Sequence, residues 1–308
     1  MRLLLALMWL LHWLPLPILG RLGEGIGSLL YLIMTPRRRV TLINLGLCMP
    51  TLSDKARRSL ARRHFQAYAR SIVERGILWW SSERRLRRLI KVEPGVPLAE
   101  FDVGPLILLC PHFVCLDVAG VAIALEASAC SMYTQQQNSV FDNALRRGRE
   151  RFHPVKIFSR SAGIKPVIRA MRDGLPFFML PDMDFGLRDA AFVPFFGIPA
   201  ATLIATARIA ATTGAGVIPV IATYLPGYRG WIVRFYPRWT DYPGPDMVAA
   251  TRRMNAFIED AVLAAPAEYL WTHKRFKTRP AGEPDLYSRE PSNLRDTPNT
   301  PDTPDTPL

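Results

Sequence analysis

Histidine and acidic side chains follow two apolar runs of this sequence, in CPHFVCLD (110–117) and in PDMDFG (181–186). In the first stretch, His112 and Asp117 are five residues apart and come after GPLILL. On one continuous helix, this spacing would set the two side chains about 140° apart. If a strand ends near Cys110 and a helix begins near Asp117, the intervening loop can instead bring the two side chains together.

A histidine paired with a carboxylate has a defined chemistry. The carboxylate accepts from one ring nitrogen, fixes the tautomer and leaves the other nitrogen as a base. No serine or cysteine follows in a G-x-S-x-G pattern, so the nucleophile would be a substrate hydroxyl activated by His112. We therefore predict that His112 and Asp117 are catalytic.

Two other interpretations of this stretch stay open. A lone histidine beside an apolar strand is commonly structural. A metal site with Cys110 and Cys115 would need a fourth ligand, and no second cluster has zinc-ligand spacing. We predict no metal ion, and the four cysteines fit reduced thiols of a cytoplasmic protein.

Asp182 and Asp184 form a second acidic pair, two residues apart and just past PFFML. In extended backbone such residues point to the same side. The pair fits a D-x-D metal clamp of a sugar-nucleotide transferase, carboxylates that hold basic side chains or an acceptor, or a turn completed by Gly186.

Basic side chains also gather where strands are expected to end. Arg160 follows VKIFS, and an arginine there suits a phosphate or a carboxylate. The stretch WTHKRFKTRP (271–280) interleaves basic and aromatic residues and suits phosphates or an acidic partner. Solvated surface residues would give the same pattern. The residues that we expect to bind substrate are Arg149, Arg160, Asp182, Asp184, Arg275 and Lys277.

Short apolar runs alternate with helical patterns from residue 104 onward. This alternation predicts an α/β fold with a mixed, largely parallel central sheet flanked by helices, and antiparallel strands late in the chain. Functional groups of such sheets gather beyond the carboxyl ends of the strands. Strands are expected at 104–110, 129–133, 155–159, 176–180, 216–224 and 231–237, and helices at 117–127, 139–151, 163–173, 201–213 and 247–264.

The first 36 residues contain two apolar runs, the first of them broken by His12, Pro15 and Pro17. Neither run has the roughly 20 uninterrupted apolar residues of a clean membrane span. We expect an uncleaved N-terminal helical anchor, either one tilted span or two segments lying in the interface. Three arginines follow at 37–39, which by the positive-inside tendency places the remaining chain in the cytoplasm.

The net charge of +13 and the isoelectric point of about 10.1 imply anionic partners. The chain shows none of the signatures of nucleic-acid-binding modules, so a membrane surface or an acidic protein is favoured. A helix expected over 53–80 carries basic side chains that can attract anionic headgroups, among them Arg57, Arg58, Arg62, Arg63 and Arg70. We divide the chain into an anchor (1–36), a main domain (37–288) and a Thr-Pro-Asp-rich tail (289–308) that should be disordered.

With these pieces in order, the sequence resembles the bacterial lipid A biosynthesis (late, or secondary) acyltransferases, the HtrB-like family. The resemblance covers about residues 1–287. PDMDFG stands where related glycerolipid acyltransferases have an E-G-T-R block, and YTQQQN (133–138) replaces a more basic stretch. The resembling blocks are RRRVTLINLGLCMP (37–50), the H-x-x-x-x-D of PHFVCLD, NSVFDNALRRGRERF (138–152), PDMDFG with AFVPFFGIPAAT (191–202), and YLWTHKRFKTRPAGEPDLY (269–287).

The resemblance implies a glycerolipid-acyltransferase-like fold at the bacterial inner membrane, with the catalytic domain on the cytoplasmic side. It implies transfer of a fatty acyl chain from acyl-acyl carrier protein to a hydroxyl of an anionic lipid A precursor. His112 matches the family's catalytic histidine, Asp117 its partner, and Arg160 a substrate-binding arginine. We expect a monomer that needs no cofactor and binds no nucleic acid. Acylation of another glycolipid, a lysophospholipid or an aminolipid, a D-x-D glycosyltransferase and a non-catalytic membrane-docking module are the alternatives.

Overall fold

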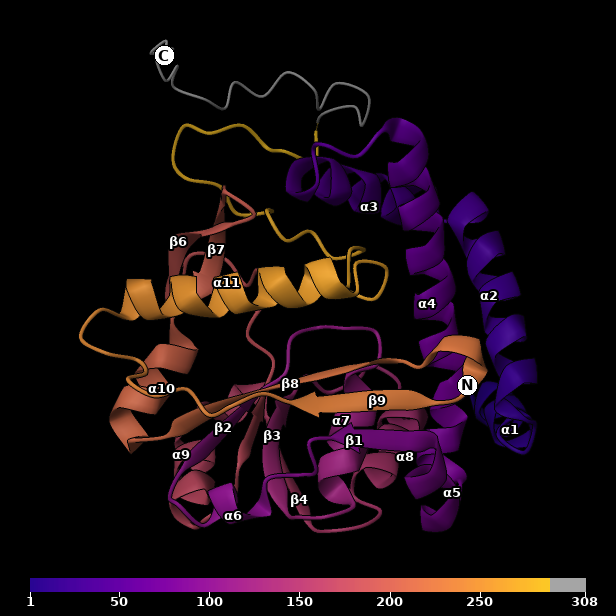
Figure 1. Ribbon diagram of the computed structural model, residues 1–308, viewed down its shortest axis with the longest axis horizontal. Coiled ribbons are helices and arrows are strands. Elements are labelled where there is room, and N and C mark those ends of the chain that lie inside the picture. The colour runs from indigo at the N-terminus through magenta and orange to yellow at the C-terminus, as the bar shows by residue number, and fades with distance from the viewer. Residues whose placement is uncertain (289–308) are drawn as a thin grey trace, which may run out of the picture.

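A seven-stranded sheet forms the centre of the computed structural model, which describes residues 1–288 (Figure 1). All neighbouring strands run parallel except β8 and β9, so the expected mixed, largely parallel sheet with a late antiparallel pair is confirmed. The strands in spatial order are β1 (Ile90–Glu93), β9 (Trp231–Phe235), β8 (Gly216–Tyr224), β2 (Leu106–Leu109), β5 (Phe177–Met179), β3 (Ala129–Tyr133) and β4 (Val155–Ser159).

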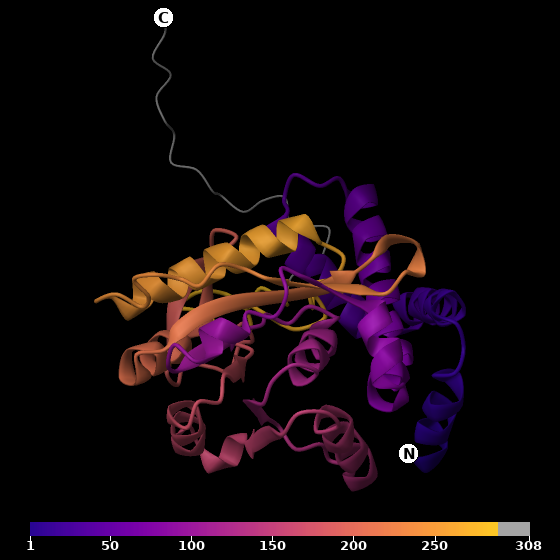
Figure 2. The ribbon, with the colours of Figure 1, turned by 60° about the horizontal axis from the view of Figure 1, so that its bottom comes forward.

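Both faces of the sheet are covered, as β2 shows. Its side chains alternate: Ile107 and Leu109 pack into one core with residues of α9, α10 and α11, while Leu106 and Leu108 pack into the other with residues of α7. Figure 2 shows α11 in gold on one side of the long strands β8 and β9. The helices of this part are α7 (Leu116–Ala124), α8 (Ser139–Arg149), α9 (Lys165–Arg172), α10 (Ala205–Thr213) and α11 (Met247–Ala264), after a short α6 (Leu98–Phe101).

Five helices precede the sheet: α1 (Arg2–Leu11), α2 (Leu16–Ile33), α3 (Thr35–Cys48), α4 (Asp54–Trp80) and α5 (Glu83–Leu89). The helix expected over 53–80 is confirmed, and the Ser53 side chain caps it by accepting from the Ala56 N–H. Helices α2 and α4 lie side by side along their lengths (Figure 1).

Glycines let α2 approach α4 closely. A Cβ on Gly27 would lie 2.4 Å from the Phe65 carbonyl oxygen, and one on Gly23 would lie 2.7 Å from the Arg70 Cα. The opposite face of α2 exposes apolar side chains: Leu29, Leu32 and Ile33 are 56–62% exposed. Among residues 1–288, α2 is the helix long and apolar enough to cross a membrane, and it packs along an arginine-rich helix.

The packing of α2 predicts opposite effects for two alanine substitutions in that helix. Gly27→Ala forces a methyl group against the α4 backbone and should lower the free energy of unfolding by about 1–3 kcal/mol. Gly25→Ala is the matched control, because a Cβ there meets nothing within 4 Å. It should raise that free energy by up to about 1 kcal/mol through helix propensity. Thermal unfolding in detergent, followed by circular dichroism, measures both variants. If Gly27→Ala were as stable as Gly25→Ala, the close packing of α2 on α4 would be contradicted.

A hairpin that the sequence patterns did not predict lies beside α11, formed by β6 (Ala190–Phe195) and β7 (Ile198–Leu203). The helix expected at 201–213 was wrong in its first turn, because β7 continues to Leu203 and α10 begins at Ala205. Pro194 and Pro199, which argue against a strand, lie opposite each other in this two-stranded ribbon. Short β1 was also missed, and the predicted tail (289–308) lies outside the described residues.

Candidate active site

His112 lies in the loop that follows β2, at the carboxyl end of the parallel strands. Its Nδ1 is 2.7 Å from Oδ1 of Asp182, and its backbone N–H donates to the same carboxylate at 3.0 Å. Asp182 follows β5, the strand next to β2, and is only 1% exposed. The neighbouring ends of two parallel strands therefore bring these two residues together.

The ionised form of Asp182 is favoured in this site. Burial opposes ionisation, but His112 and then Arg275 outweigh it and hold the pKa of Asp182 below its usual value. A carboxylate in this position accepts from Nδ1–H and leaves the lone pair on Nε2. His112 thus has the tautomer that a general base requires.

Asp117 is not the partner of His112 in this structure, contrary to the expected pairing. Helix α7 begins at Leu116 and carries Asp117 toward α4 and α8. There its carboxylate lies 2.7 Å from Nη2 of Arg149 and 3.1 Å from Nη2 of Arg75. Although burial raises the pKa of Asp117, the two guanidinium groups outweigh this and lower it to about 2.

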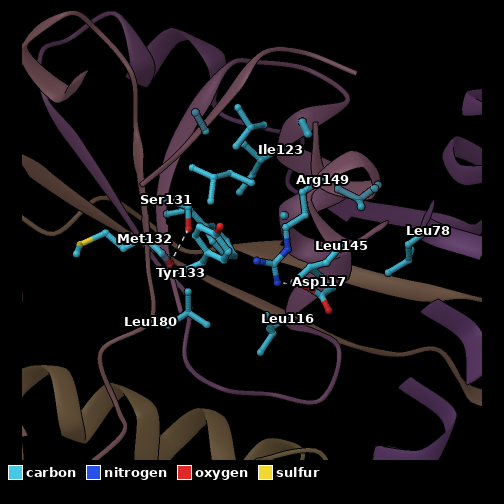
Figure 3. Close-up of a pocket in the computed structure, with 18 of the residues that line it drawn as sticks. Leu78, Leu116, Asp117, Ile123, Ser131, Met132, Tyr133, Leu145, Arg149 and Leu180 are labelled. Atoms are coloured by element: carbon cyan, nitrogen blue, oxygen red, sulfur yellow. Dashed lines mark hydrogen bonds and ion pairs between the residues drawn. The ribbon is translucent and has the colours of Figure 1, made fainter. Parts of the chain in front are cut away.

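A cavity of about 390 Å³ joins His112 to the Asp117–Arg149 pair. Figure 3 shows Asp117 and Arg149 together at its wall, with Leu116, Leu145, Ile123 and Leu180 around the space. The lining runs along all of β3, from Ala129 to Tyr133, a rise of about 13 Å for four residue steps. The cavity is therefore an elongated, mostly apolar space with a histidine and an ion pair beside it.

Asp184 holds the C-terminal segment rather than forming a clamp with Asp182. Its carboxylate accepts from the backbone N–H and the hydroxyl of Thr278, at 2.6 and 2.8 Å, and from the Gly186 N–H at 2.9 Å. The last contact forms the turn with Gly186, which was one of the three interpretations of this pair. The two aspartates are occupied by different partners, and within residues 1–288 there is no group of three or more His, Cys, Asp or Glu side chains arranged for a metal ion.

The expected basic cluster at 271–280 separates into an inner and an outer part. Arg275 is buried and donates to the Ala201 carbonyl and the Thr202 hydroxyl of β7, so it holds the hairpin and does not lie on a phosphate-binding surface. Lys277 is exposed. Arg160 stacks on the Phe185 ring, 3.9 Å from its centroid, and is not among the residues lining the His112 cavity.

The C-terminal segment also supports the His112 loop directly. Tyr269 forms an isolated β-bridge with Phe113, and the Leu270 N–H donates to the His112 carbonyl at 2.9 Å. Cys110 and Cys115 of this loop are buried, and burial raises the pKa of both thiols well above the usual value. They pack as small apolar residues.

Two acidic side chains, Glu268 and Glu74, lie near the same loop. Glu268 accepts from the Tyr224 N–H at 3.0 Å, and its carboxylate is 3.8 Å from the Cys115 sulfur. Burial raises the pKa of Glu268 to about 7, and it also raises that of Glu74 to about 7 against the opposing effect of Arg70. Both acids therefore ionise near neutral pH when the protein is folded.

This shift makes the contribution of Glu268 to stability depend on pH. Between its ordinary pKa of 4.5 and about 7, the folded state binds more protons than the unfolded state, so the free energy of unfolding falls as pH rises. Glu268→Gln removes this loss, which amounts to up to about 3 kcal/mol. We expect the melting temperature of the variant, relative to wild type, to increase from pH 5 to pH 8. If the difference in melting temperature between variant and wild type stayed constant or fell with pH, the raised pKa of Glu268 would be contradicted. Glu83→Gln, at an exposed position, is the control.

Sequence patterns missed three residues of this region: Arg75, Met183 and His273. Arg75 was one of many arginines in a basic helix, and Met183 lies unmarked between the two aspartates. His273 accepts at Nε2 from the Asp184 N–H at 3.1 Å. The only signal in the sequence was the position of His273 inside the block WTHKRF. That block was interpreted as a basic cluster, so His273 was not singled out.

Comparison with known proteins identifies the family of this chain. The family described as "Bacterial lipid A biosynthesis acyltransferase" matches residues 1–278. The chain is 29% identical over 286 residues to a lipid A biosynthesis lauroyltransferase of Escherichia coli, covering 92% of this chain and 93% of that protein. It is 30% identical over 283 residues to a lipid A biosynthesis myristoyltransferase of the same organism, covering 89% and 84%.

Among solved structures, the crystal structure of the 1-acyl-sn-glycerophosphate acyltransferase PlsC from Thermotoga maritima matches with a TM-score of 0.36 and 11% identity, covering 80% of this chain and 94% of that one. That similarity is too low to support a conclusion. The family matches nearly the whole chain, and the relatives are similar to it over most of their own lengths. This chain therefore belongs to the bacterial lipid A biosynthesis acyltransferases.

Proposed function

We propose that this acyltransferase moves a fatty acyl chain from an acyl-acyl carrier protein to a hydroxyl of a lipid A precursor, with His112 as the general base. The observation that carries the proposal is the buried Asp182 carboxylate on Nδ1 of His112, beside an elongated apolar cavity. The similar proteins named above are lauroyl- and myristoyltransferases, which supports a fatty acyl chain as the transferred group.

The reaction follows from the tautomer of His112. Nε2 takes the proton of the acceptor hydroxyl as its oxygen attacks the thioester carbonyl. The tetrahedral intermediate then collapses, the carbon–sulfur bond breaks, and the leaving thiolate receives the proton from the imidazolium. Asp182 stabilises the imidazolium between these steps, because its carboxylate is buried and already bonded to the ring. This sequence of steps needs no cofactor.

The acyl chain would lie in the cavity along β3, between the sheet and helices α7 and α8. Its walls there are apolar side chains and small residues such as Gly120 and Ala124. Arg149 and Asp117 form a charged pair at the wall, and they would contact the polar end of the donor. The chain's excess of positive charge suits both an acidic carrier protein and a phosphorylated acceptor.

We further propose that the protein binds the cytoplasmic face of the inner membrane through α1 and α2. Leu3, Leu7, Trp9 and Trp13 are exposed, as is the outer face of α2. Because α2 packs by its glycines along α4, which carries exposed Arg58, Arg62 and Arg63, the packed pair fits a position in the interface.

Direct assay tests the proposed reaction. Purified protein in detergent, given acyl-acyl carrier protein and a hydroxyacylated lipid A precursor, should yield a product heavier by one acyl group in mass spectrometry. Cells that lack the protein should lose one secondary acyl chain from their lipid A. Absence of both the product and the cellular change would refute the proposal. If the protein transferred the acyl chain only to a lysophospholipid, the acceptor would be a lysophospholipid and not a lipid A precursor.

A further inference from the structure

A second cavity, of about 360 Å³, lies beside residues 270–273, which contact the His112 loop. It is enclosed by the start of α3, by α4 and by residues 270–273, and its wall includes Phe65 and Tyr68 of α4. Helix α4 contributes to both cavities, because Phe65 and Tyr68 line the second while Leu78 and Trp79, farther along the helix, line the first. The start of α3 and residues 270–273 line only the second cavity, and α7 and α8 line only the first.

The second cavity reaches the same histidine as the first. Met183 lines both cavities. A small space between them is lined by His112, Asp182, Met183, Leu270 and His273, and the last three of these also line the second cavity. Leu270 is in addition bonded through its N–H to the His112 carbonyl. A molecule in the second cavity would therefore lie one side chain away from His112.

The polar groups of the second cavity suit an anionic amphiphile. Exposed Arg37 lies at its edge, where Nη1 donates to the Thr272 carbonyl at 3.2 Å. Nε2 of His273 accepts from the Asp184 N–H, which puts the ring proton on Nδ1, and within residues 1–288 that N–H has no hydrogen-bond partner. Burial lowers the pKa of His273 to about 4, so the ring is neutral and donates one hydrogen bond.

An apolar surface leads from the exterior to this cavity. Leu32 and Ile33, at the end of α2, are 62% and 61% exposed, and Met34 directly after them is part of the cavity wall. Phe65 and Met183 continue the apolar lining inward. The face that we propose to lie on the membrane is thus continuous with the cavity, with Arg37 at headgroup level.

We propose that the second cavity is the acceptor subsite: it takes an acyl chain of a phosphorylated lipid past Met34, and Arg37 binds the phosphate. His273 donates to an oxygen of the acceptor, and Met183 separates the acceptor from the acyl donor in the first cavity. This assignment rests on the proposed acyl transfer. The two substrates approach His112 from opposite sides, the carrier-bound chain from the α8 side and the lipid from the α2 side.

Two substitutions test the subsite without altering the catalytic pair. Thr272→Trp fills the cavity while keeping the backbone carbonyl that Arg37 contacts, and Thr212→Trp on exposed α10 is its control. Arg37→Ala removes the phosphate-binding group, and Arg172→Ala, at an exposed position at the end of α9, is its control. We expect both test variants to raise KM for the lipid A precursor by about tenfold or more, with KM for acyl-acyl carrier protein unchanged. The controls should match wild type.

Equilibrium binding of the precursor in detergent micelles, measured without donor, separates this inference from the proposed function. If wild type binds the lipid and Thr272→Trp does not, the subsite stands even when no transfer is observed, and only the reaction is refuted. If wild type transfers acyl groups but Thr272→Trp binds the lipid equally well, the subsite is refuted and the reaction stands. A rise in KM for the donor alone would assign the cavity to the carrier protein and overturn the proposal.

Discussion

Replacement of His112 with alanine is expected to lower kcat for acyl transfer by about two to four orders of magnitude, the usual contribution of a general base. The reason is the loss of Nε2, which the bond between Nδ1 and Asp182 leaves free to take the hydroxyl proton. Acyl transfer measured by mass spectrometry, with both substrates above KM, checks the expectation. A folded His112→Ala protein with full activity would exclude the mechanism.

The alanine variant leaves the buried Asp182 without its ring partner, so loss of activity must be separated from loss of structure. His112→Asn is the matched control, because its amide can still donate to Asp182 and cannot act as a base. We expect His112→Asn to melt closer to wild type than His112→Ala does, and to be as inactive. An asparagine variant that recovers activity would show that His112 acts by holding Asp182 in place.

The second large effect is expected at Asp182. Asp182→Asn keeps the shape of the side chain but removes the charge that stabilises the imidazolium, and it should lower kcat by about 10²-fold or more. Since Asp182 acts through His112, the substitution should have no further effect in a His112→Ala background. Measurement of the two single variants and the double variant under one set of conditions tests this.

Asp117→Asn completes the design, because Asp117 contacts Arg75 and Arg149 and not His112 in this structure. In the His112→Ala background it should lower the residual rate further, as two independent sites do. The reverse pattern would be decisive against the structural pairing. If Asp117→Asn were silent in that background and Asp182→Asn were additive, Asp117 would be the functional partner of His112, as the sequence spacing first indicated.

Much of the sheet could be predicted from the sequence because its strands are short, mostly apolar runs. The expected strands at 129–133 and 155–159 match β3 and β4. The hairpin β6–β7 escaped because Pro194 and Pro199 weaken a strand pattern. In the structure they face each other across an antiparallel pair whose turn, at Phe196 and Gly197, has positive φ at both residues.

The site was predictable in its positions but not in its pairing. His112 and Asp182 could each be placed at the end of an apolar run, and parallel strands bring such ends together. Which carboxylate meets His112 depends on the order of β2 and β5 in the sheet and on where α7 begins. Neither of these is encoded in local spacing, so Asp117, the nearer residue in sequence, was assigned as the partner.

The C-terminal segment that supports the His112 loop has a consequence for biosynthesis. Phe113 and the His112 carbonyl are paired with Tyr269 and Leu270, and Asp184 is held by Thr278. A ribosome adds these partners long after His112 has emerged, since synthesis runs from the N-terminus. Helices α1 and α2 are complete far earlier. The growing chain can therefore reach the membrane while its His112 loop still lacks support, and the loop is completed only after residues 269–278 have been made.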